Sequence, residues 1–571
     1  MFRSAFIIID IKIISPRFKR GTSNQGYNRA LLPLVTHPPC HVLICHLPQI
    51  VTISFVTLSF VTLSLPQLYP SLVTLFLRHP FVTPPCVWLS TSFQEMHEKD
   101  SIPRQAVIIA DSFNSRFKPI TIEKPRCLLP LVNTPLINYT LQLLVNNGFY
   151  DIIIFCCAHA DKIRKYVNEN DWIRVDGRAT IQIIALQQCF SLGDALREID
   201  SQSLIRGPFV LVTGDIVSNM DLRAAMNKHQ QYKEQDKSAM MTCVLKKVMP
   251  GHSTRGIEDD VVIALNADSN RLLGFQNANR KKLFYELDMF AENEIVDFRY
   301  DLMNTHICLC EAHVPSRFAD HFDIQDMEAF IKGTIGGEEL SGETVYTYTM
   351  ENHYAARVSN LRTYAAVSQD VINRWVYPMV PDNCTDLNGT VAEDQYIFRR
   401  RGIYYPNSVT PSKAVIKQNT VIGPGTVIGR DTIITDTVIG KTCDIGDNVL
   451  INNSFIWDEV TIKDNCIIEN AVLCSGAIVK SGTTVQKGCI LSFDTAVGPS
   501  VILPPNIRVT TKLDHDRKDS QCSNDSVDSE CTRCSDTDVS ATGNGDDILG
   551  DEKWGFIYKD SSDEDDEEVT F

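Results

Sequence analysis

Short apolar runs alternate with amphipathic segments between residue 105 and about residue 377. Runs rich in β-branched residues predict strands, and apolar residues spaced three and four apart predict helices. The predicted strands are Ala106–Ala110, Asp151–Cys157, Thr180–Ala185 and Phe209–Thr213, and the predicted helices are Leu136–Asn146, Ala160–Val167, Gly193–Ile199 and Leu222–Tyr232. This alternation favours an α/β, Rossmann-like domain over residues 103–377, with a parallel sheet covered by helices on both faces.

A second periodicity follows a loop-rich connection, residues 378–408, and occupies residues 409–510. When the repeating segments are aligned on their second apolar residue, that residue falls at positions 416, 422, 428, 434, 439, 445, 451, 456, 462, 468, 473, 479, 485, 491 and 497. Most steps are six residues, and from 428 to 473 a five-residue step recurs every third time. Three short strands in each coil explain both the step and its grouping, with glycines such as Gly423 and Gly440 at the corners. We therefore expect a left-handed hexapeptide β-helix of about five coils.

The last segment, residues 511–571, has no apolar periodicity. It holds 19 acidic and 6 basic residues, which predicts a disordered acidic tail. Its cysteines, Cys522, Cys531 and Cys534, include one CxxC but no second pair at ligand spacing, so zinc is a weak hypothesis. Its aromatic residues, Trp554, Phe556 and Tyr558, are either a docking motif or a few hydrophobic residues in a solvated tail.

Residues 1–95 differ from the rest of the chain. No Lys, Arg, Asp or Glu occurs from Ala30 to Leu77, and the phrases VTISF, VTLSF and VTLSL follow one another. Prolines leave about 15 residues between them where a membrane-spanning helix needs about 20, and the start of the segment does not fit a secretory signal. We expect a low-complexity, non-native extension, with the biological chain beginning at Met96.

The composition limits the possible classes of protein. A chain of 571 residues suggests about three or four parts, and 44% hydrophobic with 22% charged residues is ordinary for a soluble globular protein. Much of the net charge of −16 lies in the acidic tail, so the body offers no broad basic face for nucleic acid. The 18 cysteines lie mostly within apolar runs, which favours buried, reduced thiols and a cytoplasmic location. We expect no membrane span.

The stretch Gln105–Pro130 has the outline of a phosphate-binding loop. It resembles the signature of the sugar-nucleotide transferases, in which a strand is followed by glycines, an arginine and a Pro-Lys pair. Here the glycine positions hold Asp111, Ser112 and Asn114, the arginine is Arg116, and the lysine position holds Arg126. Asp215 closes the fourth strand at the position that holds magnesium in the resembling enzymes, although an aspartate after a glycine is also a common turn residue.

These changes weaken a nucleotide site. Glycines let main-chain amides approach a phosphate, whereas side chains at the same positions add bulk. If Asp111 faced the triphosphate, its charge would repel a phosphate by about 4 kcal/mol at 4 Å and an effective dielectric of 20. Arg126 retains a positive charge with a different geometry. The sequence therefore predicts a degenerate nucleotide-binding loop with no catalytic residue, cofactor or metal.

Two further functional sites, a transferase substrate loop and an acyltransferase histidine, have weaker support in the sequence. Gly193–Ala195 resembles the substrate loop of the transferases and fits the start of a helix equally well. Many hexapeptide proteins are acyltransferases that use a histidine between coils, but no histidine occurs from Arg400 to Thr510, which removes that base.

A transferase-like domain with altered glycines, a hexapeptide β-helix and an acidic tail together resemble the epsilon-subunit family of eukaryotic translation initiation factor 2B. The phrases that carry the resemblance are Ala110–Asn114, Arg116–Phe117, Pro125–Pro130, Arg357–Leu361 and Arg374–Pro378. The resemblance implies a regulatory and scaffolding subunit that promotes exchange of GDP for GTP on initiation factor 2. It also implies that the β-helix pairs with the gamma subunit in a multisubunit complex.

The resemblance also implies a partner-binding loop. The family has an Asn-Phe-Asp loop that faces the GTPase, and this chain has His321, Phe322 and Asp323 there. The family's exchange activity belongs to a helical-repeat domain after the acidic linker, and we expect that domain to be missing from this chain. The alternatives are an active sugar-1-phosphate nucleotidyltransferase, with Arg116 and Arg126 on phosphates and Asp215 on magnesium, and a binding scaffold unrelated to translation.

Overall fold

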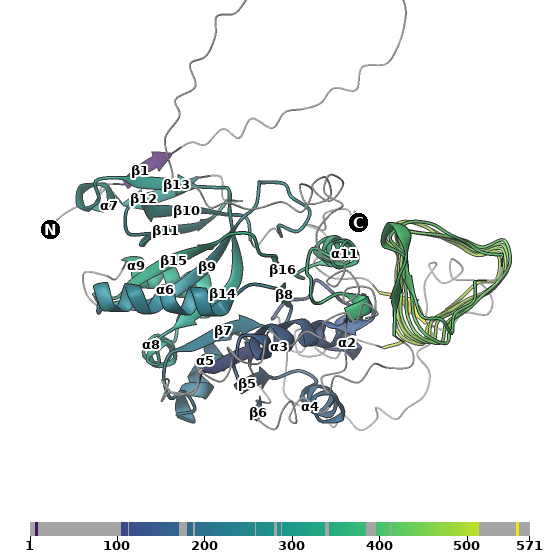
Figure 1. Cartoon of the computed structure of the whole chain (residues 1–571), viewed down its shortest axis with the longest axis horizontal. Helices are drawn as coiled ribbons and strands as arrows, with labels where there is room; N and C mark the ends of the chain where they lie inside the picture. The colour runs from purple at the N-terminus through teal and green to yellow at the C-terminus, as the bar shows by residue number, and fades with distance from the viewer. Residues whose placement is uncertain are drawn as a thin grey trace, which may run out of the picture. The chain divides into compact units, whose positions relative to one another are not determined.

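The computed structural model divides the chain into two units, Ile11–Ser101 and the remainder, and all the helices and strands below belong to the remainder (Figure 1). The residues described are 6–9, 104–111, 113–170, 180–186, 189–256, 259–278, 282–286, 288–336, 342–383, 395–411, 413–512 and 555–558. The tail cysteines Cys522, Cys531 and Cys534, Trp554, Met96 and the uncharged N-terminal repeat lie outside these residues.

A seven-stranded sheet forms the centre of the first domain, in the order β15-β9-β14-β7-β2-β5-β6. Its strands are β2 (Gln105–Ile109), β5 (Asp151–Cys156), β6 (Thr180–Ala185), β7 (Phe209–Thr213), β9 (Ala239–Lys247), β14 (Leu302–Cys310) and β15 (Thr344–Met350). Strands β2, β5, β6 and β7 run parallel, as predicted. The fully parallel sheet was wrong, because β14 runs antiparallel to both β7 and β9.

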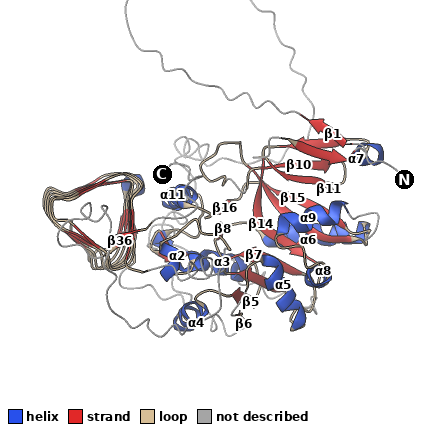
Figure 2. Ribbon diagram, turned by 180° about the vertical axis from the view of Figure 1, so that it is seen from behind, coloured by secondary structure: helices blue, strands red, loops and turns tan. Residues whose placement is uncertain are grey.

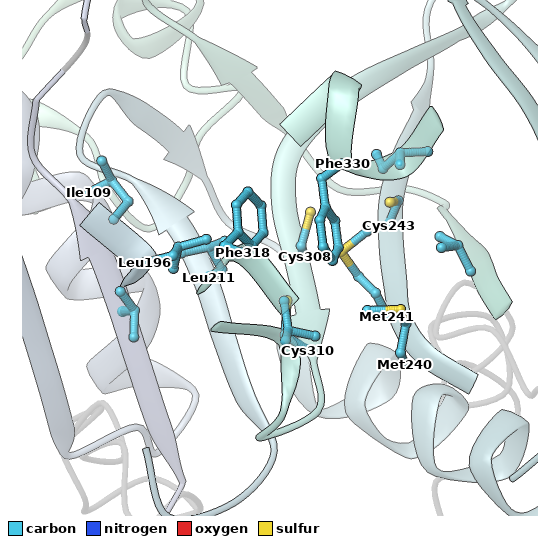
Figure 3. Close-up of a cluster of buried hydrophobic side chains, with 14 of the residues drawn as sticks. Ile109, Leu196, Leu211, Met240, Met241, Cys243, Cys308, Cys310, Phe318 and Phe330 are labelled. Atoms are coloured by element: carbon cyan, nitrogen blue, oxygen red, sulfur yellow. The ribbon is translucent and has the colours of Figure 1, made fainter. Parts of the chain in front are cut away.

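Helices cover the sheet on both faces. On one face lie α3 (Leu136–Asn146), α4 (Ala160–Glu169) and α6 (Leu222–Gln235), and on the other lie α5 (Leu192–Ser201), α8 (Val314–Asp320) and α9 (Met327–Gly336). The helices α2 (Ile120–Glu123), α7 (Asp288–Glu292) and α11 (Leu361–Ile372) pack elsewhere, and short 3₁₀ turns lie at Arg126–Leu128, Pro381–Asn383 and Arg400–Gly402. Along β2, Ala106 and Ile108 join the core beneath α3, α4 and α6. Val107 and Ile109 alternate with them into the core beneath α5, α8 and α9. Figure 3 shows this second core, in which Phe318 of α8 stacks on Phe330 of α9 with ring centroids 4.3 Å apart.

Smaller strand pairs complete the first domain. They are β1 (Phe6–Ile9) with β12 (Leu283–Glu286), β10 (Val261–Asn266) with β11 (Leu272–Asn277) and β13 (Val296–Arg299), β8 (Ile216–Ser218) with β16 (Ala355–Arg357), and β3 (Pro130–Leu131) with β4 (Thr134–Pro135). The pair β8 and β16 matters most for the site, because it joins the residues after β7 to those before α11.

The second domain is the left-handed β-helix that the repeat predicts, and its three walls form a triangle (Figure 1). The wall that contacts the first domain, the docked face, contains β17 (Ile397–Phe398), β18 (Tyr404–Tyr405), β20 (Val421–Ile422), β23 (Val438–Ile439), β26 (Phe455–Ile456), β29 (Val472–Leu473), β32 (Ile490–Leu491), β35 (Arg508–Thr510) and β36 (Phe556–Ile557). The second wall contains β19 (Val415–Ile416), β22 (Ile433–Thr435), β25 (Leu450–Asn452), β28 (Ile467–Glu469), β31 (Thr484–Val485) and β34 (Ile502–Leu503). The third wall contains β21 (Val427–Ile428), β24 (Asp444–Ile445), β27 (Thr461–Ile462), β30 (Ile478–Val479) and β33 (Ala496–Val497). The apolar positions used for alignment line its interior.

Two kinds of residue form the corners of the β-helix. A Cβ added to Gly423 would lie 2.4 Å from the main-chain oxygen of Gly440 on the next coil, so stacking leaves no room for a side chain. The other kind adopts a left-handed backbone, as at Asn448 with φ 57° and Asn465 with φ 59°. Asparagine and aspartate tolerate this conformation better than most residues. The sequence pattern revealed the glycine corners but not the asparagine corners.

The docked face of the β-helix packs against α11 and the segment before α3. Its outward side chains, such as Phe455 and Trp457, share one buried core with Tyr364 of α11. The Trp457 indole N–H donates to the Tyr364 hydroxyl at 3.3 Å, and the Asn133 amide donates to the main-chain oxygen of Ile439 at 2.7 Å. The β-helix is therefore joined to the first domain by both apolar and polar contacts.

Candidate functional site

The loop after β2 turns its acidic residue toward the sheet. The Asp111 carboxylate accepts a hydrogen bond from the main-chain amide of Cys157, at the end of β5. Burial raises the pKa of Asp111 to about 6, against the opposing effect of the hydrogen bonds from Cys157 and Ala158. An Asp111 that faced a triphosphate was expected to repel it. The Asp111 carboxylate instead binds the end of the neighbouring strand β5, so that repulsion does not apply. Ser112 lies outside the described residues.

Replacing Asp111 with Asn is expected to stabilise the first domain. A folded-state pKa of about 6, raised from 3.8, means that ionisation opposes folding. The loss of folding free energy caused by ionised Asp111 is absent below pH 3.8 and grows as the pH rises to 6. Above pH 6 it amounts to roughly 2 to 3 kcal/mol. The amide oxygen of Asn can still accept from Cys157. Urea unfolding of Asp111→Asn at pH 7.5 should show this gain, and the gain should shrink toward zero near pH 4.

A matched control for that substitution is Asp161→Asn, because the Asp161 side chain is 99% exposed. We expect the control to change the unfolding free energy by less than about 0.5 kcal/mol. An Asp111→Asn protein that is less stable than the wild type at pH 7.5 would contradict the role assigned to burial.

A buried carboxylate between two arginines occupies the centre of the site. Asp215 accepts from Arg126 Nη1 at 3.3 Å and from Arg357 Nε at 3.1 and 3.2 Å, and the Thr213 hydroxyl donates to it at 2.6 Å. The side chains of Asp215 and Arg126 are 6% and 1% exposed. Two guanidinium groups thus surround the carboxylate that would hold magnesium in an active transferase.

Local structure explains this arrangement of charges. Strand β7 ends at Thr213, and the short strand β8 begins directly after Asp215. Strand β16 pairs with β8 so that Arg357 lies opposite Ile216, and the Val358 amide donates to the main-chain oxygen of Asp215 at 3.0 Å. The pairing therefore places a residue 142 positions away in the sequence beside Asp215.

The charges of this cluster compensate one another. Burial by itself would raise the pKa of Asp215, but Arg357 and Arg126 favour the carboxylate and hold its pKa at about 2. Arg126 also donates to the Asn114 side-chain oxygen, and its guanidinium lies over the Phe117 ring at 4.9 Å. The negative charge of Asp215 is therefore already matched by groups of this chain.

The remaining residues of the altered loop lie around this cluster. The Arg116 main-chain amide donates to the Asn114 side-chain oxygen at 3.4 Å, and the Arg116 side chain is partly buried. The structure therefore brings Asn114, Arg126 and Asp215 together, while Asp111 bonds the end of β5.

Sequence reasoning missed part of the site. Arg357 lies in a phrase that carries the family resemblance, but nothing local in the sequence links it to Asp215. The buried Asp259 and the partly buried His306 form a second pair, at 2.5 Å. Burial opposes ionisation of Asp259, but His306 and Arg357 together lower its pKa below the ordinary value. The two clusters are thus electrostatically connected through Arg357.

The expected partner-binding loop is exposed. His321, Phe322 and Asp323 follow α8 directly, and Phe322 is 73% exposed. The Arg197 guanidinium lies 5.3 Å from the centre of the Phe322 ring. Phe190, which sequence reasoning did not select, is 81% exposed on the loop before α5.

Main-chain contacts join those two loops. The Gly193 amide donates to the Gln325 oxygen at 3.0 Å, and a Cβ at Gly193 would lie 2.4 Å from the Ile324 oxygen. Ser191 caps α5 by accepting from the Asp194 amide at 3.1 Å, so the Gly193–Ala195 phrase is a helix start. The result is one surface that presents two exposed phenylalanines.

Neither a metal site nor a membrane-spanning helix is found in the described part of the chain. Within it, no group of three or more His, Cys, Asp or Glu side chains is placed to hold a metal ion. Likewise, none of its helices combines the length and apolar character needed to cross a bilayer.

Comparison with known proteins agrees with this two-domain arrangement. Residues 105–253 match the nucleotidyl transferase family, and residues 400–503 match the family described as the EIF2B subunit epsilon LbH domain. The chain is 38% identical to translation initiation factor eIF2B subunit epsilon of Schizosaccharomyces pombe, over 58% of this chain and 48% of the relative. It is also 38% identical to the corresponding subunit of Dictyostelium discoideum, over 58% of this chain and 46% of the relative.

A more distant similarity extends to a second kind of subunit. The chain is 26% identical to eIF2B subunit gamma of Dictyostelium discoideum, over 27% of this chain and 34% of the relative. This chain therefore spans about half the length of the epsilon relatives that it matches, and a smaller part of the gamma relative.

Proposed function

We propose that this chain, a homologue of the epsilon subunit of translation initiation factor eIF2B, is a regulatory and scaffolding subunit of a guanine-nucleotide exchange factor. In this role it promotes the exchange of GDP for GTP on initiation factor 2 and acts in the cytosol. Its relatives are translation initiation factor subunits, and the similarity covers 58% of the chain.

The observation that carries this proposal is the state of Asp215. A nucleotidyltransferase needs a carboxylate free to bind Mg²⁺ and cationic groups free to bind phosphates. In this chain Asp215 accepts from Arg126 and Arg357 inside the protein. Freeing these groups for a ligand would break two buried ion pairs, which supports a degenerate nucleotide site.

An exchange factor needs no covalent chemistry. It accelerates release of the nucleotide by binding the nucleotide-free GTPase more tightly than the nucleotide-bound form. A contact surface is therefore the chemistry that this function requires, and the loop His321–Asp323 with its neighbour Phe190 provides exposed aromatic area. Exposed aromatic anchors commonly dominate the energy of protein interfaces.

The gamma subunit is the proposed partner within the complex. The chain resembles eIF2B gamma as well as epsilon, so a pair of related subunits is consistent with the comparisons. The β-helix offers flat walls for such pairing. Its second wall carries exposed apolar side chains, among them Val415, Ile467 and Ile502.

Affinity purification of the tagged chain from its own cells, followed by mass spectrometry, tests the assignment. We expect recovery of the gamma subunit, the other eIF2B subunits and initiation factor 2. Recovery of a different assembly without these subunits would point to a scaffold unrelated to translation and would overturn the proposal.

Phe322→Ala is expected to weaken binding to initiation factor 2 by at least about tenfold, because truncating an aromatic hot-spot residue costs about 2 kcal/mol or more. The measurement is the dissociation constant of the purified complex for initiation factor 2. Phe284→Ala is a matched control, since Phe284 is 50% exposed on a different part of the first domain. Equal affinities for wild type, Phe322→Ala and the control would remove this loop from the interface.

A further inference from the structure

The β-helix ends in a strand whose amides face its open end. On the docked face, the Ile490 amide donates to the Ile507 oxygen and the Ser492 amide donates to the Val509 oxygen, both at 2.9 Å. The register pairs Ile490 with Arg508, so the amides of Arg508 and Thr510 point toward where another coil would stack. No further coil follows β35 among the described residues. A row of such groups is a template for adding a strand.

A short segment from the acidic tail lies on this edge. Strand β36 pairs antiparallel with β35, with Ile557 opposite Val509 and Phe556 opposite Thr510. The Tyr558 amide donates to the Arg508 oxygen at 2.7 Å, and Tyr558 is only 8% exposed. Figure 2 labels β36 at the β-helix. The aromatic residues that the sequence left open between a docking motif and a solvated tail therefore include two that dock.

Glycine is required where this segment reaches the edge. Gly555 has φ 128°, a conformation that other residues adopt rarely. An added Cβ would also lie 3.1 Å from both the Thr510 oxygen and Val509 Cγ1. A glycine therefore stands at a position where the backbones of β35 and the tail segment approach each other closely.

We propose that β35 is a strand-addition edge whose occupant is the segment Gly555–Tyr558 of the same chain, and that this segment, the tail cap, keeps the edge from pairing with a second copy. An antiparallel strand cannot continue the parallel coil, so it ends the stack. The opposite end of the docked face is closed in the same way, because β17 pairs antiparallel with β18. Solenoids need such terminal caps to remain soluble.

Chain connectivity favours covering of the β35 edge by the tail cap of the same molecule over covering by the tail cap of a second copy. The sequence between Thr510 and Gly555 supplies 44 residues. The entropic cost of closing a loop grows only slowly with its length, so a tether of this size is no obstacle. A tethered segment also has an effective concentration in the millimolar range, far above that of a second copy in a dilute solution.

Hydrogen exchange on the full chain tests the tail cap. Tyr558→Pro removes the amide that donates to the Arg508 oxygen and should speed exchange of the Arg508 and Thr510 amides by about tenfold or more. Asp563→Pro places the same residue type five positions further along as a control and should leave these rates unchanged. Gly555→Ala tests the same contact by another route and should also speed exchange.

Sedimentation of the same proteins tests the protective role. The Tyr558→Pro protein should show association that increases with concentration more steeply than that of the wild type and the Asp563→Pro control. The proposal is overturned if wild-type and Tyr558→Pro edge amides exchange at the same rate. It is also overturned if the deprotected variant associates no more than the wild type, or if wild-type protection falls on dilution, which would mean that the cap comes from another copy.

Discussion

Replacing Asp215 with Asn is expected to destabilise the first domain by about 3 to 5 kcal/mol, the usual cost of removing one partner from a buried ion pair. The substitution leaves the guanidinium groups of Arg126 and Arg357 buried without the carboxylate that compensates them. Urea unfolding monitored by circular dichroism at neutral pH measures this loss. The wild type should also lose stability in acid, because the pKa of Asp215 lies at about 2, below the ordinary 3.8.

The direction of that acid effect follows from the lowered pKa. Stability from the ionised Asp215 is fully present above pH 3.8 and is lost as the pH falls through 2. The Asp215→Asn protein should lack this part of the pH dependence.

Two comparisons make the Asp215 experiment specific. Asp320→Asn removes a carboxylate whose side chain is 60% exposed and lies 3.5 Å from Arg317, so it should cost less than about 1 kcal/mol. Replacing Asp215, Arg126 and Arg357 together with Leu, Met and Met removes the whole charged cluster and should cost less than Asp215→Asn alone. An Asp215→Asn protein as stable as the Asp320→Asn control would show that the carboxylate is not a structural partner of the arginines.

Replacing Trp457 with Ala is expected to cost about 3 to 5 kcal/mol, as for other buried tryptophans. Trp457 is 3% exposed, lies in the core shared by the two domains and donates to the Tyr364 hydroxyl. Its ring also lies 5.8 Å from that of Phe493 and 5.9 Å from the Lys124 ammonium. Because the lost contacts join the β-helix to α11, the two domains should unfold less cooperatively.

Differential scanning calorimetry measures both consequences of the Trp457 substitution. We expect a lower midpoint and a separation of the transition into two. Trp375→Ala is the matched control, since Trp375 is 68% exposed and its loss should have little effect. A Trp457→Ala protein with a single transition at the wild-type temperature would contradict the assignment of this residue to the domain contact.

In the first domain the sequence predicted four strands and four helices, all between Ala106 and Tyr232, and it did not predict the elements that follow them. The strand predictions for β6 and β7 and the helix prediction for α3 match their observed bounds. The β-helix was evident because each coil repeats one pattern of buried residues. The antiparallel β14 was not among the predicted strands, and a buried apolar run has the same pattern in either direction, so the sequence could not show that the sheet is mixed.

The site was harder to predict because it depends on distant pairing. The sequence located Asp215, which follows a strand that the periodicity reveals, and Arg126, which stands at the lysine position of the transferase signature. It could not reveal that Arg357 lies beside Asp215, since this contact depends on the register between β8 and β16. The direction of Asp111 was also undetermined, because a carboxylate after a strand can face a ligand or the end of the neighbouring strand. Side-chain direction at a loop is decided by tertiary structure.

The central proposal is that this domain, with Asp215 held by Arg126 and Arg357, serves as a binding scaffold rather than as a transferase. The most direct test is a pyrophosphate-release assay on the purified full chain with Mg²⁺, a hexose 1-phosphate, and GTP or UTP. We predict no turnover above the rate without protein. Magnesium-dependent release of pyrophosphate by the wild-type chain above that rate would contradict the proposal and establish a working sugar-1-phosphate nucleotidyltransferase.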